Sequence, residues 1–359
     1  MRISRWTCFS ILACFLAVIL AQQSAPSAVV AQPQSSSIAT ASMPTRITLD
    51  VVVNDKAGKS VAELEPPDFT LLDNNQPRKI LSFRRTDGLV GSKFDPPVEV
   101  VIVLDSVNMP YQAVTLLRLQ LEKFLRQNGG RLAQPVSILA YGSDGLRVLP
   151  LPTKDGNALA AMMNTSVGTV RARGTAAGSY GLAEQFTASV QTLKGIADNY
   201  ARRPGRKMIV WLGNGWPLLD GPQFTLSTEV RQRHYEDILE VSKKLREARI
   251  VLYGLYTLNA ADDRLLYEAY LKPVKDFRRA EAGNVSLQVL AMQTGGRVLE
   301  PSNDIAGQIN SCVADIGAYY TLTFAPPPAM QTNEYHDLKV QVTQPGLTTR
   351  TSSGYYDQP

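Results

Sequence analysis

Polar side chains gather in three loops of this 359-residue chain, at places where a parallel sheet would bind a ligand. One loop starts at Asp105, directly after the apolar run 98–104, and a second, residues 213–217, follows the apolar run 207–212. The third, residues 173–179, precedes a helical pattern. Because ligands bind at the carboxyl ends of the strands in an open parallel sheet, we expect the three loops to converge. The candidate partner-binding residues are Asp105, Asn108, Thr175, Asn214 and Trp216.

Trp216 opens an apolar stretch, residues 216–219, inside the second loop. Aromatic and aliphatic anchors dominate protein interfaces, so this stretch is expected to be an exposed contact surface. Ordinary packing under the following helix is the alternative interpretation.

The sequence holds no arrangement of side chains that is typical of catalysis. Its two histidines, His234 and His336, are far apart along the chain, and neither stands beside a candidate nucleophile. The Gly-Ser-Asp-Gly segment 142–145 fits a hairpin turn, because a nucleophile elbow needs Gly-x-Ser-x-Gly. A Cys/His zinc set is also missing. We therefore expect a binding protein and not an enzyme, with an envelope hydrolase of unrecognised active site as the alternative.

Composition favours a soluble globular protein, and the lack of a catalytic arrangement favours a protein partner as its ligand. The hydrophobic fraction is 44% and the formal net charge is +5, without a dense block of lysine and arginine. Nucleic-acid binding would call for such a block, so it is not expected. The glycines at 174, 178 and 181 are not followed by the Gly-Lys-Ser/Thr of a phosphate loop, and no small-molecule cofactor is expected.

The N-terminus has the pattern of a secretory signal peptide. Arg2 and Arg5 precede an apolar run, residues 11–21, that is too short for a comfortable membrane span. We predict a signal peptide over residues 1–31, cleaved after Ala21 or Ala31, and a disordered tether over residues 32–44. The mature protein is then periplasmic, envelope-bound or extracellular. An uncleaved anchor, which would be the sole membrane contact, and a lipoprotein signal ending at Cys14 are the alternatives.

Cysteine usage agrees with export. Cys8 and Cys14 lie in the predicted signal peptide, so Cys312 is alone in the mature chain and has no partner for an intrachain disulfide. Cys312 shares a helical face with Ile305, Ile309 and Ile316, which predicts a buried structural thiol.

The elements that must position these loops follow from hydrophobic periodicity. An N-terminal β segment, residues 45–94, and a C-terminal β segment, residues 319–359, flank a region of alternating strands and helices, residues 95–318. Strands are predicted at 47–53, 61–64, 69–72, 80–83, 98–104, 136–141, 146–149, 207–212, 250–255, 297–299, 320–324, 336–342 and 347–351. Helices are predicted at 114–127, 179–200, 228–248, 285–294 and 304–318. The pattern indicates an α/β fold, a doubly wound and mostly parallel sheet, with a small antiparallel β unit built from both flanks.

The order of these elements resembles a von Willebrand factor A domain. The matching parts are Val-Ile-Val-Leu-Asp at 101–105, Gly-Thr at 174–175 and the strand at 206–212. The flanks, residues 50–58, Pro-Asp-Phe at 67–69 and Gly-Tyr-Tyr at 354–356, are similar to those of von Willebrand-related proteins abundant in acidobacteria. The resemblance covers residues 45–357 and implies a non-enzymatic module that binds a partner.

Members of that wider family often hold a divalent cation at a metal-ion-dependent adhesion site. The resemblance places its first carboxylate at Asp105 and its threonine at Thr175. The two serine positions are Val107 and Met109, which offer no oxygen, and the second carboxylate position is the neutral Asn214. Magnesium needs six hard oxygen ligands, so the site is expected to be degenerate and cation-free, with Mg²⁺ or Ca²⁺ as the exception. Asp105 is then expected to bond to loop amides or to cap a helix.

Overall fold

The computed structural model describes residues 46–148, 152–166, 178–219, 224, 226–256 and 267–357. The predicted signal peptide, the tether and the candidate residue Thr175 lie outside these residues. The chain from Pro44 onward forms one compact unit. Across the described part of the chain, no helix is both long and apolar enough to cross a membrane.

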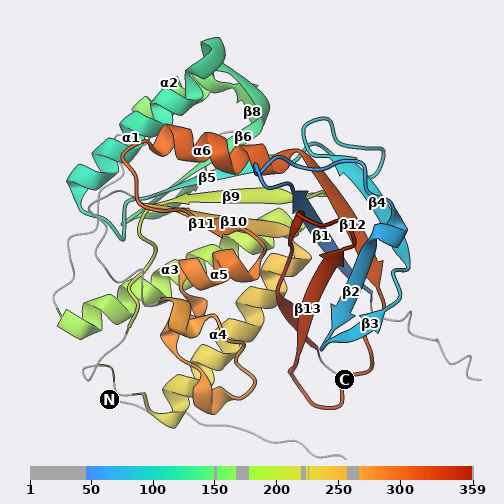
Figure 1. The fold of residues 1–359 in the computed structure, drawn as a ribbon. Coiled ribbons are helices and arrows are strands. Elements are labelled where there is room, and N and C mark those ends of the chain that lie inside the picture. Colours follow the sequence, from blue (N-terminus) through green and yellow to red (C-terminus); the bar gives the residue numbers. More distant parts are fainter. Residues whose placement is uncertain are drawn as a thin grey trace, which may run out of the picture. The chain divides into compact units, whose positions relative to one another are not determined.

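A seven-stranded sheet lies at the centre of this unit, in the order β11-β10-β9-β5-β6-β7 with β8 beside β6 (Figure 1). The parallel strands are β5 (Glu99–Asp105), β6 (Arg131–Gly142), β9 (Lys207–Leu212), β10 (Ile250–Leu255) and β11 (Arg297–Val298). The antiparallel strands are β7 (Gly145–Val148) and β8 (Thr153–Asp155). From β5 the chain winds one way to β6 and β7, and it later winds the other way through β9, β10 and β11. The winding direction therefore reverses between β5 and β9, where such sheets bind ligands.

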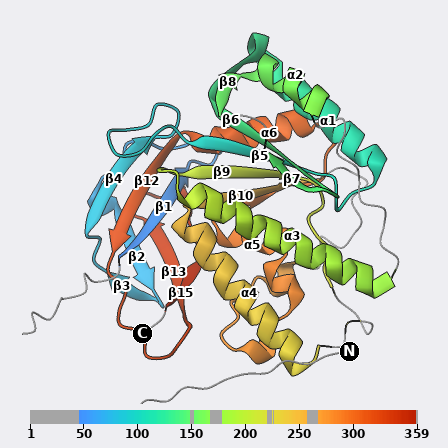
Figure 2. The same ribbon diagram turned by 180° about the vertical axis from the view of Figure 1, so that it is seen from behind.

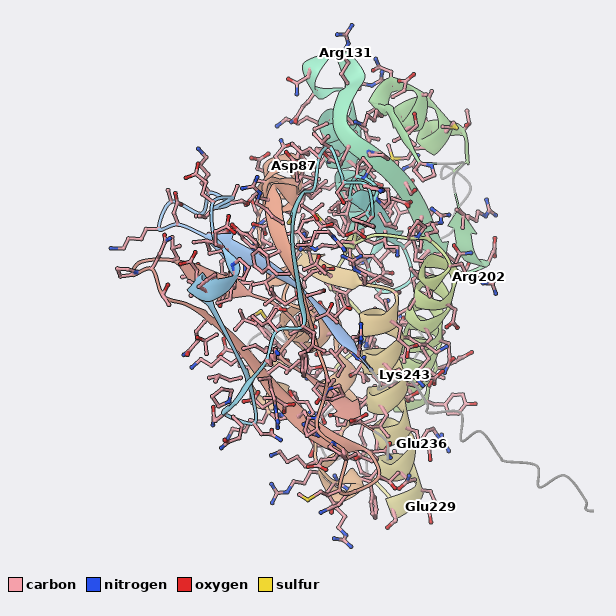
Figure 3. All side chains as sticks on the ribbon, turned by 90° about the vertical axis from the view of Figure 1, so that its right-hand side faces the viewer. Asp87, Arg131, Arg202, Glu229, Glu236 and Lys243 are labelled. Atoms are coloured by element: carbon pink, nitrogen blue, oxygen red, sulfur yellow. The ribbon has the colours of Figure 1, made fainter. Side chains whose placement is uncertain are left out.

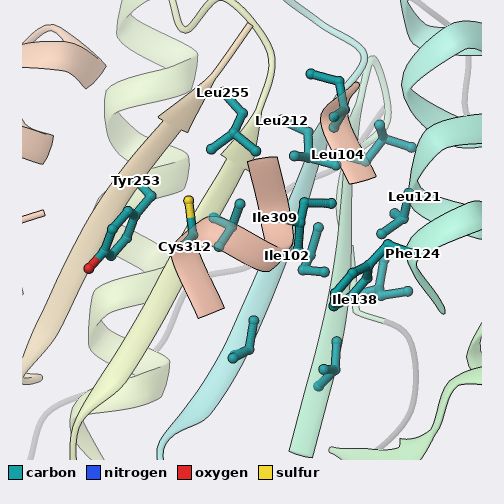
Figure 4. Packing of buried hydrophobic residues seen from close by; sticks show 14 of the residues in the cluster. Ile102, Leu104, Leu121, Phe124, Ile138, Leu212, Tyr253, Leu255, Ile309 and Cys312 are labelled. Atoms are coloured by element: carbon teal, nitrogen blue, oxygen red, sulfur yellow. The ribbon is translucent and has the colours of Figure 1, made fainter. Parts of the chain in front are cut away.

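Helices cover both faces of this sheet (Figures 1 and 2). One face carries α1 (Tyr111–Leu125), α2 (Gly156–Ser166) and α6 (Ile305–Val313), and the other carries α3 (Gly178–Ala201), α4 (Thr228–Glu247) and α5 (Leu287–Gln293). Alternate residues of β5 serve the two layers, because successive strand side chains point to opposite faces. Ile102 packs toward α1 and α6, and Val103 packs toward α3 and α4. Figure 4 shows the first layer, in which Cys312 lies among aliphatic side chains near Ile309.

Helix α4 is an example of the amphipathic helices that cover the sheet. Its buried residues include Tyr235, Ile238 and Val241, while Glu229, Glu236 and Lys243 are exposed along its outer face (Figure 3). Ser227 caps its start by accepting a hydrogen bond from the Val230 amide.

The two flanks of the sequence form a β unit of two four-stranded antiparallel sheets. The first sheet, in the order β14-β1-β12-β4, contains β14 (Thr348–Arg350), β1 (Ile47–Asn54), β12 (Ala318–Phe324) and β4 (Ser82–Asp87). The second, in the order β15-β13-β2-β3, contains β15 (Gly354–Asp357), β13 (Glu334–Val342), β2 (Phe69–Asp73) and β3 (Gln76–Arg78). In each sheet an N-terminal strand pairs with a C-terminal one, β1 with β12 and β2 with β13. The predicted sharing of one β unit by both flanks is confirmed.

Short 3-10 helices lie at Pro66–Asp68, Gln127–Gly130, Phe277–Arg279, Ala282–Val285 and Ala314–Ile316. The strand predicted at residues 61–64 is wrong, because this segment is held by single contacts. Val61 donates its amide to the Val53 carbonyl, and Leu64 donates its amide to the Tyr320 hydroxyl. The predicted helix at 285–294 begins later, at Leu287, because the Ser286 hydroxyl caps it.

Candidate binding site

The carboxyl ends of β5 and β9 place two of the candidate loops side by side. The strands pair in parallel up to Leu104 and Leu212, so Asp105 and Gly213 leave the sheet at the same edge. A side chain at Gly213 would put its Cβ 2.9 Å from the Asp105 Cβ, and the backbone φ there is 146°. A glycine is therefore needed at the end of β9 for the two loops to meet.

Asp105 is fully buried, and protein donors occupy both of its carboxylate oxygens. Oδ1 accepts the amides of Val107 at 2.9 Å and Asn108 at 3.0 Å. Oδ2 accepts the Asn108 side-chain amide at 2.8 Å and the Trp211 indole N–H at 3.0 Å. Burial raises the pKa of Asp105, and these four hydrogen bonds oppose that rise. The expected bonding of Asp105 to loop amides is confirmed.

This donor arrangement does not fit a divalent cation. A cation at Asp105 would have to displace the Trp211 indole or the Asn108 amide from the carboxylate. The neighbouring Val107 and Met109 side chains are buried in the two hydrophobic layers and carry no oxygen. Among the described residues, no group of three or more His, Cys, Asp or Glu side chains could hold a metal ion, and Thr175 lies outside them.

Helix α3 fixes the loop that follows β5. Gln185 donates its side-chain amide to the Val107 carbonyl at 2.6 Å, and Asn108 also donates to the Ser189 hydroxyl at 3.1 Å. Ser189 in turn donates to the Gln185 carbonyl. These bonds join α3 to the loop, so the β5 loop is rigid before any partner arrives.

The expectation that Trp216 is an exposed contact residue is wrong. Only 4% of Trp216 is exposed, and its ring packs edge-on against Trp211 at 5.6 Å. Its indole N–H donates to the Val285 carbonyl at 3.0 Å. The Trp216 ring is buried and its only donor is paired, so Trp216 is a core residue of the layer formed by α3, α4 and α5. This packing is the alternative interpretation that the sequence allowed.

Two buried amide oxygens near this edge have no partner among the described residues. They are Asn108 Oδ1 and Asn214 Oδ1. Asn214 is held through its backbone, because its carbonyl accepts the Gln288 side-chain amide at 3.1 Å.

Two exposed tyrosines at the same edge were missed by the sequence reasoning. Tyr111, the first residue of α1, is 71% exposed, and Tyr180, in the first turn of α3, is 85% exposed. A signal for Tyr180 was its position off the buried stripe that contains Phe186 and Val190. Tyr111 lies three residues before the buried Val114, at helical spacing, so periodicity alone predicts its burial.

No protein-family profile matches the sequence, and no curated protein matches it. Solved structures with some likeness include the human COPII-coat protein Sec24c, at 11% identity and a TM-score of 0.33. The match covers 82% of this chain and 50% of Sec24c. A mutant of the PilB minor pilin from Streptococcus sanguinis gives 11% identity and a TM-score of 0.34, over 62% of each chain.

The VWA domain of SpRpn10 is also similar, with 12% identity and a TM-score of 0.23, over 45% of this chain and 77% of that domain. This chain thus spans half to about three fifths of the lengths of Sec24c and PilB. With TM-scores this low, the α/β assignment rests on the strand order of the chain itself: a central, mostly parallel sheet with flanking antiparallel sheets.

Proposed function

We propose that this chain is an exported binding module of the von Willebrand factor A type, which holds a protein partner without a divalent cation and without catalysing a reaction. The observation that carries the proposal is that protein donors bond to both carboxylate oxygens of Asp105. Its two oxygens accept four protein donors, so the position where a cation would bind is already used to fix the loop. Export rests on the N-terminal pattern of residues 1–31.

The contact surface that we propose is the carboxyl edge of the central sheet, centred on Tyr111 and Tyr180. Large exposed aromatic side chains at the rim of a ligand-binding edge are common anchors of protein interfaces. The rigid β5 loop lowers the entropy cost of binding.

The test is a quantitative pull-down from envelope extract with the mature protein and a Tyr111→Ala/Tyr180→Ala variant. We expect the variant to retain at least about tenfold less of the captured partner, because each hot-spot aromatic residue contributes about 2 kcal/mol or more. Phe94→Ala is the matched control. Phe94 is 68% exposed and lies before β5, at the amino edge of the same sheet.

Capture should persist in EDTA and in the Phe94→Ala variant. If EDTA abolishes capture of the partner, the cation-free mechanism is wrong. If the double variant captures as much as the unchanged protein, the carboxyl edge is not the contact surface.

A further inference from the structure

A groove rich in arginine lies at the other end of the central sheet, between the outer face of the first antiparallel sheet and the end of α4. Its volume is about 350 Å³, and four arginines line it: Arg46, Arg84, Arg246 and Arg249. The volume is within the range of small-molecule sites.

Two of the four arginines are neutralised by buried carboxylates. Arg84 pairs with Asp95 at 2.5 Å, while Arg249 pairs with Asp50 and Asp95, each at 2.6 Å. Their guanidinium groups shape the wall of the groove, and their charge is balanced within the protein.

The other two arginines are not neutralised in this way. Neither Arg46 nor Arg246 has an ion pair with any residue that the structure describes, and the acidic side chain lining the groove, Glu247, is exposed. Arg46 is exposed at the start of β1. Arg246 is half-buried, with its guanidinium carbon 6.0 Å from the centre of the Tyr355 ring. Burial lowers the pKa of Arg246, and the nearby negative charges, Glu247 first, only partly oppose this loss of water.

Hydroxyl groups lie beside these charges on the sheet. Thr48 and Thr323 line the groove from paired strands, and their Oγ1 atoms are 3.4 Å apart. The groove also continues inward. A cavity of about 60 Å³ that water can enter shares Thr48, Arg246 and Arg249 with it and reaches Ser353 and Tyr335.

We propose that this groove binds the oxyanion of a small ligand, a phosphate or carboxylate group, through Arg246 and Arg46. A planar guanidinium group donates two parallel hydrogen bonds to such an anion, and the threonine hydroxyls can complete its coordination. The inner cavity accepts an uncharged, partly apolar portion of the same ligand. The site lies away from the carboxyl edge, so it is independent of the proposed partner contact.

The test is isothermal titration of the chain at low salt with pyrophosphate and, separately, with citrate, because the two probes distinguish a phosphate from a carboxylate ligand. We expect saturable binding of at least one probe at millimolar concentration, weakened about tenfold in Arg246→Gln and in Arg46→Gln. Arg202→Gln is the matched control. Arg202, labelled in Figure 3, is an exposed arginine that does not line the groove.

If Arg246→Gln has an unchanged melting temperature in the absence of anion, this variant is folded. Arg46→Gln changes an exposed residue and is a second, independent test of anion binding. The proposal is overturned if neither probe binds up to about 10 mM. It is equally overturned if both arginine variants bind as tightly as Arg202→Gln, because the attraction would then be general surface charge.

Discussion

The role of Asp105 is decided by the residues that surround its two oxygens. A carboxylate at the end of a central strand is compatible with a cation ligand and with a loop anchor, and the sequence alone allows both. The structure favours the loop anchor, because the Trp211 indole and the Asn108 side-chain amide both donate to Oδ2 of Asp105. Since the indole N–H is a donor only, Trp211 occupies a position on that oxygen for which a cation would have to compete.

We predict that Asp105→Ala lowers the free energy of unfolding by about 3 kcal/mol, because it leaves buried donors unpaired. The loss should be equal in EDTA and in millimolar Mg²⁺ or Ca²⁺, as measured by urea unfolding and thermal melts. Asp144→Ala, an exposed aspartate in the β6–β7 hairpin, is the control and should change stability little. A cation-dependent rise in melting temperature that disappears in Asp105→Ala would restore the cation-based mechanism.

Cys312 gives a pH-dependent prediction at the same scale. Burial raises the pKa of its thiol to about 12, while an unfolded thiol ionises near 8.5. Between these values the native state binds more protons than the unfolded state, so the stability that Cys312 contributes falls as pH rises. Relative to Cys312→Ala, the unchanged protein should lose about 2 kcal/mol between pH 8 and pH 10 in urea unfolding. A difference between the two proteins that is constant over this range would contradict the burial of the thiol.

At the scale of elements, the sequence predicts best where one physical requirement dominates. The strands β5, β9 and β10 are buried almost throughout. Each therefore consists mostly of apolar residues, and such a continuous apolar run can be recognised in the sequence. The burial of Cys312 follows in the same way from the helical spacing of its isoleucine neighbours. The meeting of the β5 and β9 loops also follows, because parallel strands end at a shared edge.

Prediction fails where a tertiary contact, which leaves no local pattern, decides the structure. Residues 61–64 have the composition of a strand, but no neighbouring strand among the described residues pairs with them, and Leu64 is bonded by the distant Tyr320 hydroxyl. The burial of Trp216 depends on the Val285 carbonyl, which is remote in sequence. Conversely, Tyr111 has the helical spacing of a buried residue but is exposed. The positions of the β5 and β9 loops could therefore be predicted, while the exposed tyrosine of the neighbouring helix α1 could not.

At the scale of the whole molecule, Arg249 joins the β unit to the central sheet. It precedes β10, pairs with Asp50 on β1 and pairs with Asp95 just before β5. Asp95 also accepts Arg84 of β4, so the cluster links the first antiparallel sheet to two central strands. Burial alone would raise the pKa of Asp95, but the bonds from Arg249 and Arg84 more than reverse this and lower it. The positions of these charged side chains depend on both flanks of the sequence, because β1 and β12 pair in one sheet.

We predict that Arg249→Met lowers the free energy of unfolding by about 3–5 kcal/mol, because Asp50 loses its ion-pair partner and Asp95 keeps only Arg84. Arg249→Lys should lose less, since it keeps the charge but not the paired geometry. Both variants keep a β-carbon at a backbone φ of 53°, so backbone strain is the same in the two. Amide exchange should accelerate in β1 and β5 of Arg249→Met. The difference in stability between Arg249→Met and the unchanged protein should narrow as pH falls below about 4, because Asp95, whose pKa in the unchanged protein is lowered from its ordinary value, becomes protonated there. A methionine variant as stable as the lysine variant at about pH 7 would show that the two sheets are held together by packing alone.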